Sequence, residues 1–83
     1  MKIKNNDQIG DKSGQRVFNF APGSGEINVY RLLPTGEFST VPFLTINNTT
    51  PEKQRMAILP VGVGLRWKFE LSVDATATYS ELN

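Results

Sequence analysis

Residues 65–74 read Leu-Arg-Trp-Lys-Phe-Glu-Leu-Ser-Val-Asp and decide the fold class. Apolar and polar residues alternate without a break across these ten positions. Successive side chains of a strand point to opposite faces of a sheet, so this period of two is typical of a strand with one buried and one solvated face. We therefore expect Trp67, Phe69 and Leu71 to lie in the centre of a hydrophobic core.

Further short runs of strand-forming residues lie on both sides of this stretch. They cover residues 16–20, 26–33, 37–41, 43–46, 54–59 and 75–82. Turn signals separate them, and Pro34-Thr35-Gly36 between the second and third runs predicts a β-hairpin. With about seven short strands and no convincing helix, the chain is predicted to be all-β, either a small antiparallel β-sandwich or a barrel.

The small size of the chain limits its core. A chain of 83 residues has room for one domain, and small domains often need a disulfide, a metal or oligomerisation in addition to their core. The sequence contains neither cysteine nor histidine, which excludes disulfides and the usual zinc ligands. Two alternatives remain, namely that the domain folds alone or that it packs against copies of itself or a larger assembly.

The first 14 residues differ in composition from the rest. Beyond Met1 they contain only two apolar side chains, Ile3 and Ile9, among Lys, Asn, Asp, Gln, Ser and Gly. Such a segment buries little surface to offset the entropy lost on ordering. We therefore expect a flexible N-terminal arm over residues 1–14 and a single domain over residues 15–83. The arm is either ordered by a neighbouring molecule or has no role.

The charge balance argues against nucleic acid and membrane partners. Nine basic and eight acidic residues give a net charge of +1, with no basic stripe of the kind that binds nucleic acid. No apolar run is long enough to span a membrane, and the N-terminus lacks the apolar stretch of a secretory signal. The sequence predicts a protein made in a cytoplasm.

No arrangement of residues suggests catalysis. Without histidine or cysteine, a nucleophile would need a Ser–Lys pair, and no Ser-x-x-Lys spacing occurs. The eight carboxylates are spread along the chain, and so small a sandwich offers little room for a deep cleft. We predict that the protein is not an enzyme and has no catalytic residues, metal ligands or cofactor.

Two valines occupy a turn that is rich in glycine. Val61 and Val63 lie in Pro60-Val61-Gly62-Val63-Gly64. Their side chains either fold back into the core or form an exposed apolar tip, and an exposed tip would be a contact site.

The order of several segments resembles a known family. Val-Pro-Phe-Leu-Thr-Ile at residues 41–46, the Leu-Pro-x-Gly turn and aromatic strand at 59–69, and the Thr-rich end at 75–82 are similar to small β-sandwich accessory proteins of tailed bacteriophages. These include capsid decoration (cement) proteins and small spike or fibre-base subunits.

The resemblance implies a virion protein, made in the host cytoplasm, that forms a dimer or trimer and binds capsid or other virion proteins. Its arm would brace neighbouring capsid subunits, with Ile3 and Ile9 as apolar anchors and Lys2 and Lys4 as a polar rim. Together with Val61 and Val63, these are the candidate partner-binding residues.

Two other classes of binding protein fit the pattern. In a carbohydrate-binding module, Trp67, Tyr30 and Tyr79 would stack on sugar rings, although Trp67 lies on the apolar face of its strand. An oligonucleotide-binding barrel is the second alternative, and the nearly neutral charge disfavours it.

Overall fold

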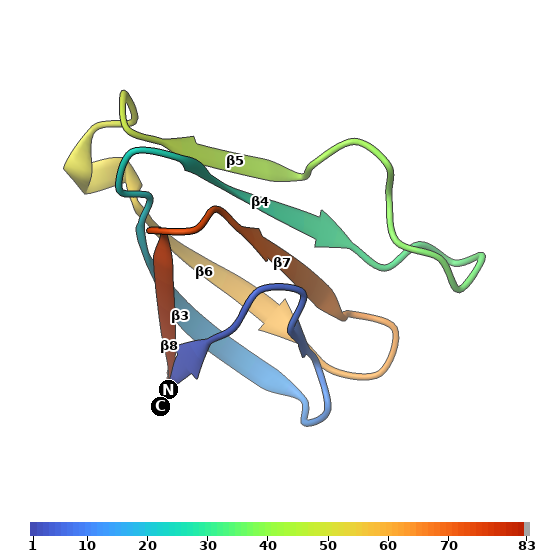
Figure 1. Ribbon diagram of the computed structural model, residues 1–83. Coiled ribbons are helices and arrows are strands. Elements are labelled where there is room, and N and C mark those ends of the chain that lie inside the picture. The colour runs from blue at the N-terminus through green and yellow to red at the C-terminus, as the bar shows by residue number, and fades with distance from the viewer. Residues whose placement is uncertain (83) are drawn as a thin grey trace.

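The computed structural model describes residues 1–82, and two antiparallel sheets of four strands pack face to face in it (Figure 1). The first sheet has the order β1-β8-β3-β6 and the second the order β2-β7-β4-β5. The elements are β1 (Lys2–Ile3), β2 (Gln8–Ile9), β3 (Gly14–Ala21), β4 (Glu26–Arg31), β5 (Leu44–Asn47), the 3₁₀ helix η1 (Glu52–Gln54), β6 (Met56–Val61), β7 (Trp67–Leu71) and β8 (Thr76–Glu81). The fold is a β-sandwich and not a closed barrel. Residue 83, the last of the predicted domain, lies outside the described residues.

The core fills the space between the two sheets. Phe18 of β3 and Phe69 of β7 are fully buried, and their ring centroids lie 5.0 Å apart across the interior. The predicted alternation over residues 65–74 is confirmed within β7, where Trp67 and Phe69 are buried and Leu71 is partly buried against the edge of the core. It fails at Val73, which is fully exposed in the turn after the strand. Aromatic rings supply much of the apolar surface that so small a domain must bury.

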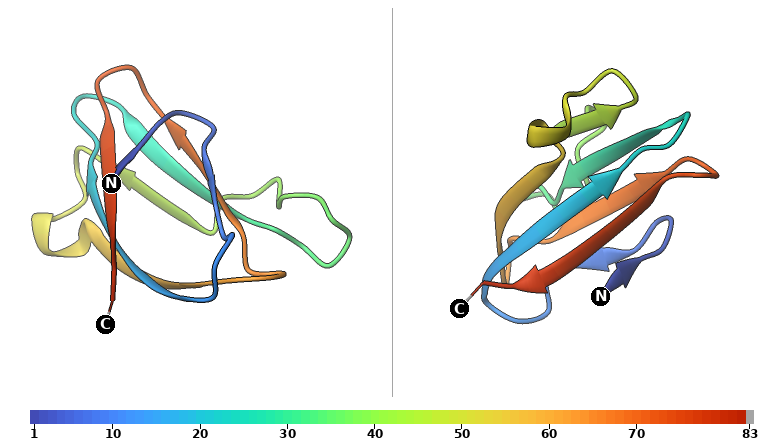
Figure 2. Two further views of the ribbon diagram at one scale, coloured as in Figure 1. Left: turned by 90° about the horizontal axis from the view of Figure 1, so that it is seen from below. Right: turned by 90° about the vertical axis from the view of Figure 1, so that its left-hand side faces the viewer.

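The predicted hairpin between residues 26–33 and 37–41 is confirmed only close to its turn. β4 ends at Arg31, and the antiparallel bridge from Leu32 to Phe38 follows it. The backbone N–H groups of Leu33 and Ser39 donate to the carbonyl oxygens of Glu37 and Arg31 at 2.8 and 2.9 Å, but residues 37–41 form no strand. The loop over residues 32–43 projects beyond the sheets (Figures 1 and 2), and β4 pairs with β5. The physical reason is the chemistry of the loop, where Pro34 and Pro42 lack backbone N–H donors.

The N-terminal residues belong to the sandwich, which differs from the expected flexible arm. β1 pairs with β8 in the first sheet and β2 pairs with β7 in the second, so the segment crosses from one sheet to the other at the side of the sandwich (Figure 2). The side chain of Ile3 is only 2% exposed. Composition alone does not indicate this pairing, because it does not reveal that two isoleucines meet a core formed by distant strands.

The strand before the glycine-rich turn lies two residues further along the chain than the predicted 54–59, because Gln54 ends the 3₁₀ helix and β6 begins at Met56. β6 continues through Pro60 to Val61, and the turn begins at Gly62, which is bridged to Leu65.

Among residues 1–82, no helix has the length and apolar character needed to cross a membrane.

Candidate binding sites

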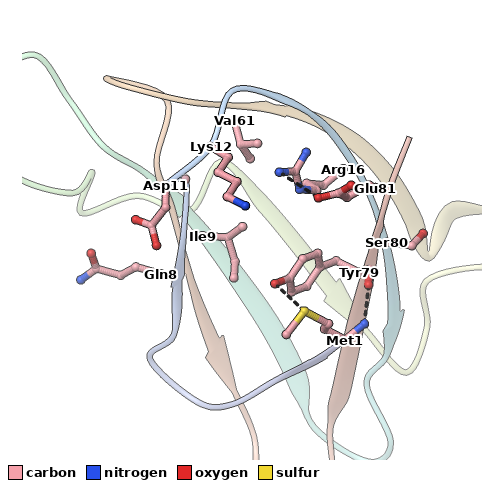
Figure 3. A pocket seen from close by; sticks show the side chains of 11 residues that line it. Met1, Gln8, Ile9, Asp11, Lys12, Arg16, Val61, Tyr79, Ser80 and Glu81 are labelled. Atoms are coloured by element: carbon pink, nitrogen blue, oxygen red, sulfur yellow. Dashed lines mark hydrogen bonds and ion pairs between the residues drawn. The ribbon is translucent and has the colours of Figure 1, made fainter. Parts of the chain in front are cut away.

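A cavity of about 530 Å³ opens between the N-terminal segment and strands β3 and β8 (Figure 3). We call it the arginine cavity, since the side chain of Arg16 lines it. Ile9 and Val61 form an apolar part of its wall, and the remaining charged side chains of the wall are Asp11, Lys12 and Glu81. The cavity therefore combines an apolar surface with charges of both signs.

Arg16 occupies an unusual position for a charged residue. It lies on β3 with the same strand parity as the buried Phe18 and Phe20, so it points to the interior side of the first sheet. Its side chain is only 10% exposed. Long charged side chains are rarely buried to this extent unless their polar groups are engaged.

The guanidinium group of Arg16 is incompletely engaged by the rest of the protein. Its Nη1 donates a hydrogen bond to the Gln15 carbonyl oxygen at 3.1 Å, and its Nη2 lies 3.7 Å from Oε1 of Glu81. Within residues 1–82 these are its only polar contacts, although a guanidinium carries five N–H donors. The Glu81 side chain is 65% exposed, so solvent competes with Arg16 for its carboxylate.

Gly14 provides the space that the Arg16 side chain occupies. Its φ of 145° is rare for residues with a side chain, and a Cβ there would lie 2.9 Å from Nη1 of Arg16. A glycine at the start of β3 therefore allows the guanidinium to lie against the backbone.

Among the described residues, two cations at the arginine cavity have no carboxylate partner, namely Lys12 and the amino group of Met1, which donates to the Tyr79 carbonyl oxygen at 2.6 Å. Asp11 accepts a hydrogen bond from Nη2 of Arg66 at 2.7 Å, and Glu81 faces Arg16. Lys12 forms no ion pair with the described residues, and Figure 3 shows its amino group pointing toward Arg16 and Glu81. The wall of the cavity thus carries a positive excess.

The structure brings together only two of the six predicted partner-binding residues, namely Ile9 and Val61. Ile3 and Val61 are each 2% exposed and form part of the core of the domain, so neither side chain offers a free surface to a partner. Val63 is 97% exposed at the tip of the β6–β7 turn, and Lys2 and Lys4 are exposed near β1. Of the two expected positions, Val61 therefore occupies the core and Val63 the exposed apolar tip.

The sequence contained a signal for Arg16 that composition did not reveal. Arg16 shares its parity with Phe18 and Phe20, so an inward charge could have been read from the strand pattern. No local pattern indicated Lys12, because its proximity to Arg16 depends on how the N-terminal segment crosses the sandwich.

The outer face of the first sheet lacks charged side chains across β8, β3 and β6, whereas Lys2 of the two-residue edge strand β1 lies opposite Thr78 on the same side. We call the surface of these three strands the charge-free face. Alternation and register place on it Thr76, Thr78 and Ser80 of β8, Gln15, Val17, Asn19 and Ala21 of β3, and Met56, Ile58 and Pro60 of β6. Met56 and Ile58 are 53% and 50% exposed. Half-exposed apolar side chains on a flat, uncharged sheet are typical of a contact surface.

The outer face of the second sheet carries charge and satisfies it internally. Asn28 donates hydrogen bonds to Glu26 and Glu70, and Nζ of Lys68 lies 5.1 Å from the ring centroid of Tyr30. Burial, together with the hydrogen bond that the Tyr30 hydroxyl donates to Glu70, raises the pKa of Tyr30 above its ordinary value. This face is a network of solvated polar groups.

Trp67 cannot serve as a sugar-stacking platform in this fold. It is 3% exposed, its Nε1 donates to the Pro60 carbonyl oxygen at 2.7 Å, and the ring of Phe43 packs on it at 4.9 Å. Its burial agrees with its position on the apolar face of the predicted strand.

Within the described part of the chain, no group of three or more carboxylate, imidazole or thiolate side chains is placed to hold a metal ion. Searches against protein-family models, curated proteins and solved structures find no match to the chain.

Proposed function

We propose that the chain is a non-enzymatic structural protein of a virion, namely a capsid decoration subunit that works as a symmetric oligomer. The single observation that carries this proposal is the charge-free face. In a domain where about one residue in five is charged, three adjacent strands present no charge on one side. Interface cores are depleted of charged residues in the same way.

A second copy of the chain is the occupant that suits the charge-free face. A charged partner would find charge only at the rim of this face, where Lys2 lies opposite Thr78 and Glu52 and Lys53 lie beside Met56. Two copies can meet through the uncharged centre without burying an unpaired charge. Contact between identical faces about a two-fold axis is the commonest form of association between like chains.

The edge of the first sheet favours contact between faces over pairing between edges. β6 forms one edge of the sheet and the two-residue β1 the other, and Pro60 within β6 has no N–H to offer a further strand. The carbonyl oxygen of Pro60 already accepts the hydrogen bond from Trp67. These features protect the edge while the half-exposed Met56 and Ile58 remain on the face.

We assign attachment to the capsid to a different surface, namely the loops at one end of the sandwich, which carry exposed apolar side chains. The backbone N–H of Leu32 donates to the Arg66 carbonyl oxygen at 2.9 Å, which joins the β4–β5 loop to the β6–β7 turn. Val41, Phe43 and Val63 on these loops are 73%, 56% and 97% exposed. Exposed apolar side chains on two joined loops are suited to burial against a neighbouring protein.

Density-gradient centrifugation of lysates from cells that make the chain naturally tests the virion assignment. We expect the chain to sediment with nucleic-acid-containing particles and to be detected there by mass spectrometry. A Val63→Lys exchange should weaken this association, and Val73→Lys, at an equally exposed valine of the β7–β8 turn, is the matched control. Recovery of the chain only in the particle-free fractions would contradict the proposal.

A further inference from the structure

The arginine cavity meets the charge-free face only at Ser80, which lines both, and it is separate from the apolar loops. Its residues come from Met1, β2 and the segment after β2, Arg16 of β3, Val61 at the end of β6, and residues 79–81 of β8. The proposed assembly does not use it, yet it holds a buried arginine with free donors beside an apolar wall. We propose that the arginine cavity binds a carboxylate that carries an aliphatic body.

The geometry of Arg16 favours a carboxylate as the ligand. A guanidinium presents paired N–H donors in a fixed plane that matches the two oxygens of a carboxylate. The side chain is nine-tenths buried, and its only polar contacts among residues 1–82 are one carbonyl and the loose pair with Glu81. Hydrogen bonds to a charged group in such a partly desolvated site are stronger than in water.

The rest of the wall suggests the body of the ligand. The half-buried Ile9 supplies an apolar surface, Val61 adds only the 2% of its surface that stays accessible, and Tyr79 adds an aromatic side chain whose hydroxyl faces Met1. A volume of about 530 Å³ lies within the range of small-ligand pockets. An aliphatic chain of several carbons attached to the carboxylate would cover this wall.

The balance of charge favours a monoanion over a phosphate dianion. Two carboxylates, Asp11 and Glu81, already line the cavity and face Arg66 and Arg16. Within residues 1–82, Lys12 and the amino group of Met1 are left over as cations. Arg16 offers a paired set of donors that one carboxylate satisfies, whereas a second negative charge on the ligand would be repelled by the acidic residues of the wall.

Glu81 acts as an internal competitor for Arg16. Its oxygen lies 3.7 Å from Nη2, which is longer than a charge-assisted hydrogen bond, and its side chain is largely exposed. An incoming carboxylate can therefore take the direct hydrogen-bonding position while Glu81 moves toward solvent. Removal of the Glu81 charge should strengthen binding.

Titration of the full chain with hexanoate, followed by NMR chemical shifts, tests the proposal, with 1-hexanol as the uncharged control. We expect saturable shifts at the amides of residues 9–16 and 79–81 with hexanoate alone. Lys12→Gln should weaken binding roughly 2- to 5-fold, the range of an exposed charge pair. Glu81→Gln should strengthen it, and Lys53→Gln, at a distant exposed lysine, should have no effect.

Arg16→Lys, which keeps the charge but loses the planar pair of donors, should weaken binding by roughly 10-fold, and a thermal melt of this variant checks that it folds. A short peptide that ends in an isoleucine carboxylate, compared with its amide, separates a protein-borne carboxylate from a free acid. The proposal is overturned if neither hexanoate nor the peptide binds at about 10 mM, if hexanol binds equally, or if Lys12→Gln and Glu81→Gln leave affinity unchanged.

Discussion

Asp74 joins two turns at one end of the sandwich. Its Oδ2 accepts hydrogen bonds from the backbone N–H of Ser24 at 2.9 Å and from the Ser24 hydroxyl at 2.7 Å. Ser24 lies between β3 and β4, whereas Asp74 lies between β7 and β8, so the contact links the two sheets. The backbone hydrogen bond and then the hydroxyl hydrogen bond lower the pKa of the Asp74 carboxyl below its ordinary value of 3.8.

The lowered pKa predicts an acid-dependent contribution to stability. A carboxyl whose pKa is lower in the folded state stabilises the fold above its unfolded pKa, and this contribution is lost as pH falls through the folded pKa. Asp74→Asn should therefore lower the midpoint of urea unfolding at about pH 7 and make little difference at about pH 2. Ser24→Ala keeps the backbone donor, so it should lower the midpoint of urea unfolding at about pH 7 by less than Asp74→Asn does, and again make little difference at about pH 2. If Asp74→Asn lowers the midpoint equally at both pH values, this role of Asp74 is contradicted.

The N-terminal segment shows how very short strands are held by tertiary contacts. β1 and β2 contain two residues each, too few to be stable by local propensity. The backbone N–H of Asn6 donates to the Phe69 carbonyl oxygen at 2.7 Å, and the N–H of Phe69 donates to the backbone carbonyl oxygen of Asp7 at 3.0 Å. Together with the burial of Ile3, these bonds fix the segment to the second sheet as well as the first.

Removal of the Ile3 side chain tests whether this segment is part of the cooperative fold. Ile3→Ala should lower the free energy of unfolding by about 2–4 kcal/mol, because it leaves a cavity in the core. Val73→Ala, at a fully exposed valine, should change it by less than about 0.5 kcal/mol. Both values follow from urea denaturation monitored by the fluorescence of Trp67. Equal effects of the two exchanges would mean that residues 1–14 behave as the independent arm first expected.

The sequence predicted those elements whose pattern is local. The alternation of residues 65–74 predicted β7 and the burial of Trp67, and the all-β class followed from similar runs. β1 and β2 were missed because their pairing joins residues far apart in the chain, such as Ile3 with Ala77. The same holds for the arginine cavity, where Lys12 and Arg16 come together only through the path of the N-terminal segment.

The domain as a whole presents two unlike faces. The outer face of the second sheet carries Glu26, Lys68 and Glu70 in a solvated network, whereas the charge-free face carries no charge on three strands. A domain of 83 residues buries only about 60–65% of its unfolded surface, so association of copies would add to a thin core. The difference between the faces assigns that association to the first sheet.

Light scattering coupled to size-exclusion chromatography tests this central claim most directly. The chain has a mass of 9.2 kDa, and we expect a defined mass of two copies, since contact between identical faces closes with a dimer. Ile58→Lys, which places a charge in the middle of the charge-free face, should give a monomer that keeps the buried Trp67 emission, while Val73→Lys should leave the oligomer unchanged. A monomer for the unmodified chain at all concentrations, or an oligomer that survives Ile58→Lys, would contradict the account.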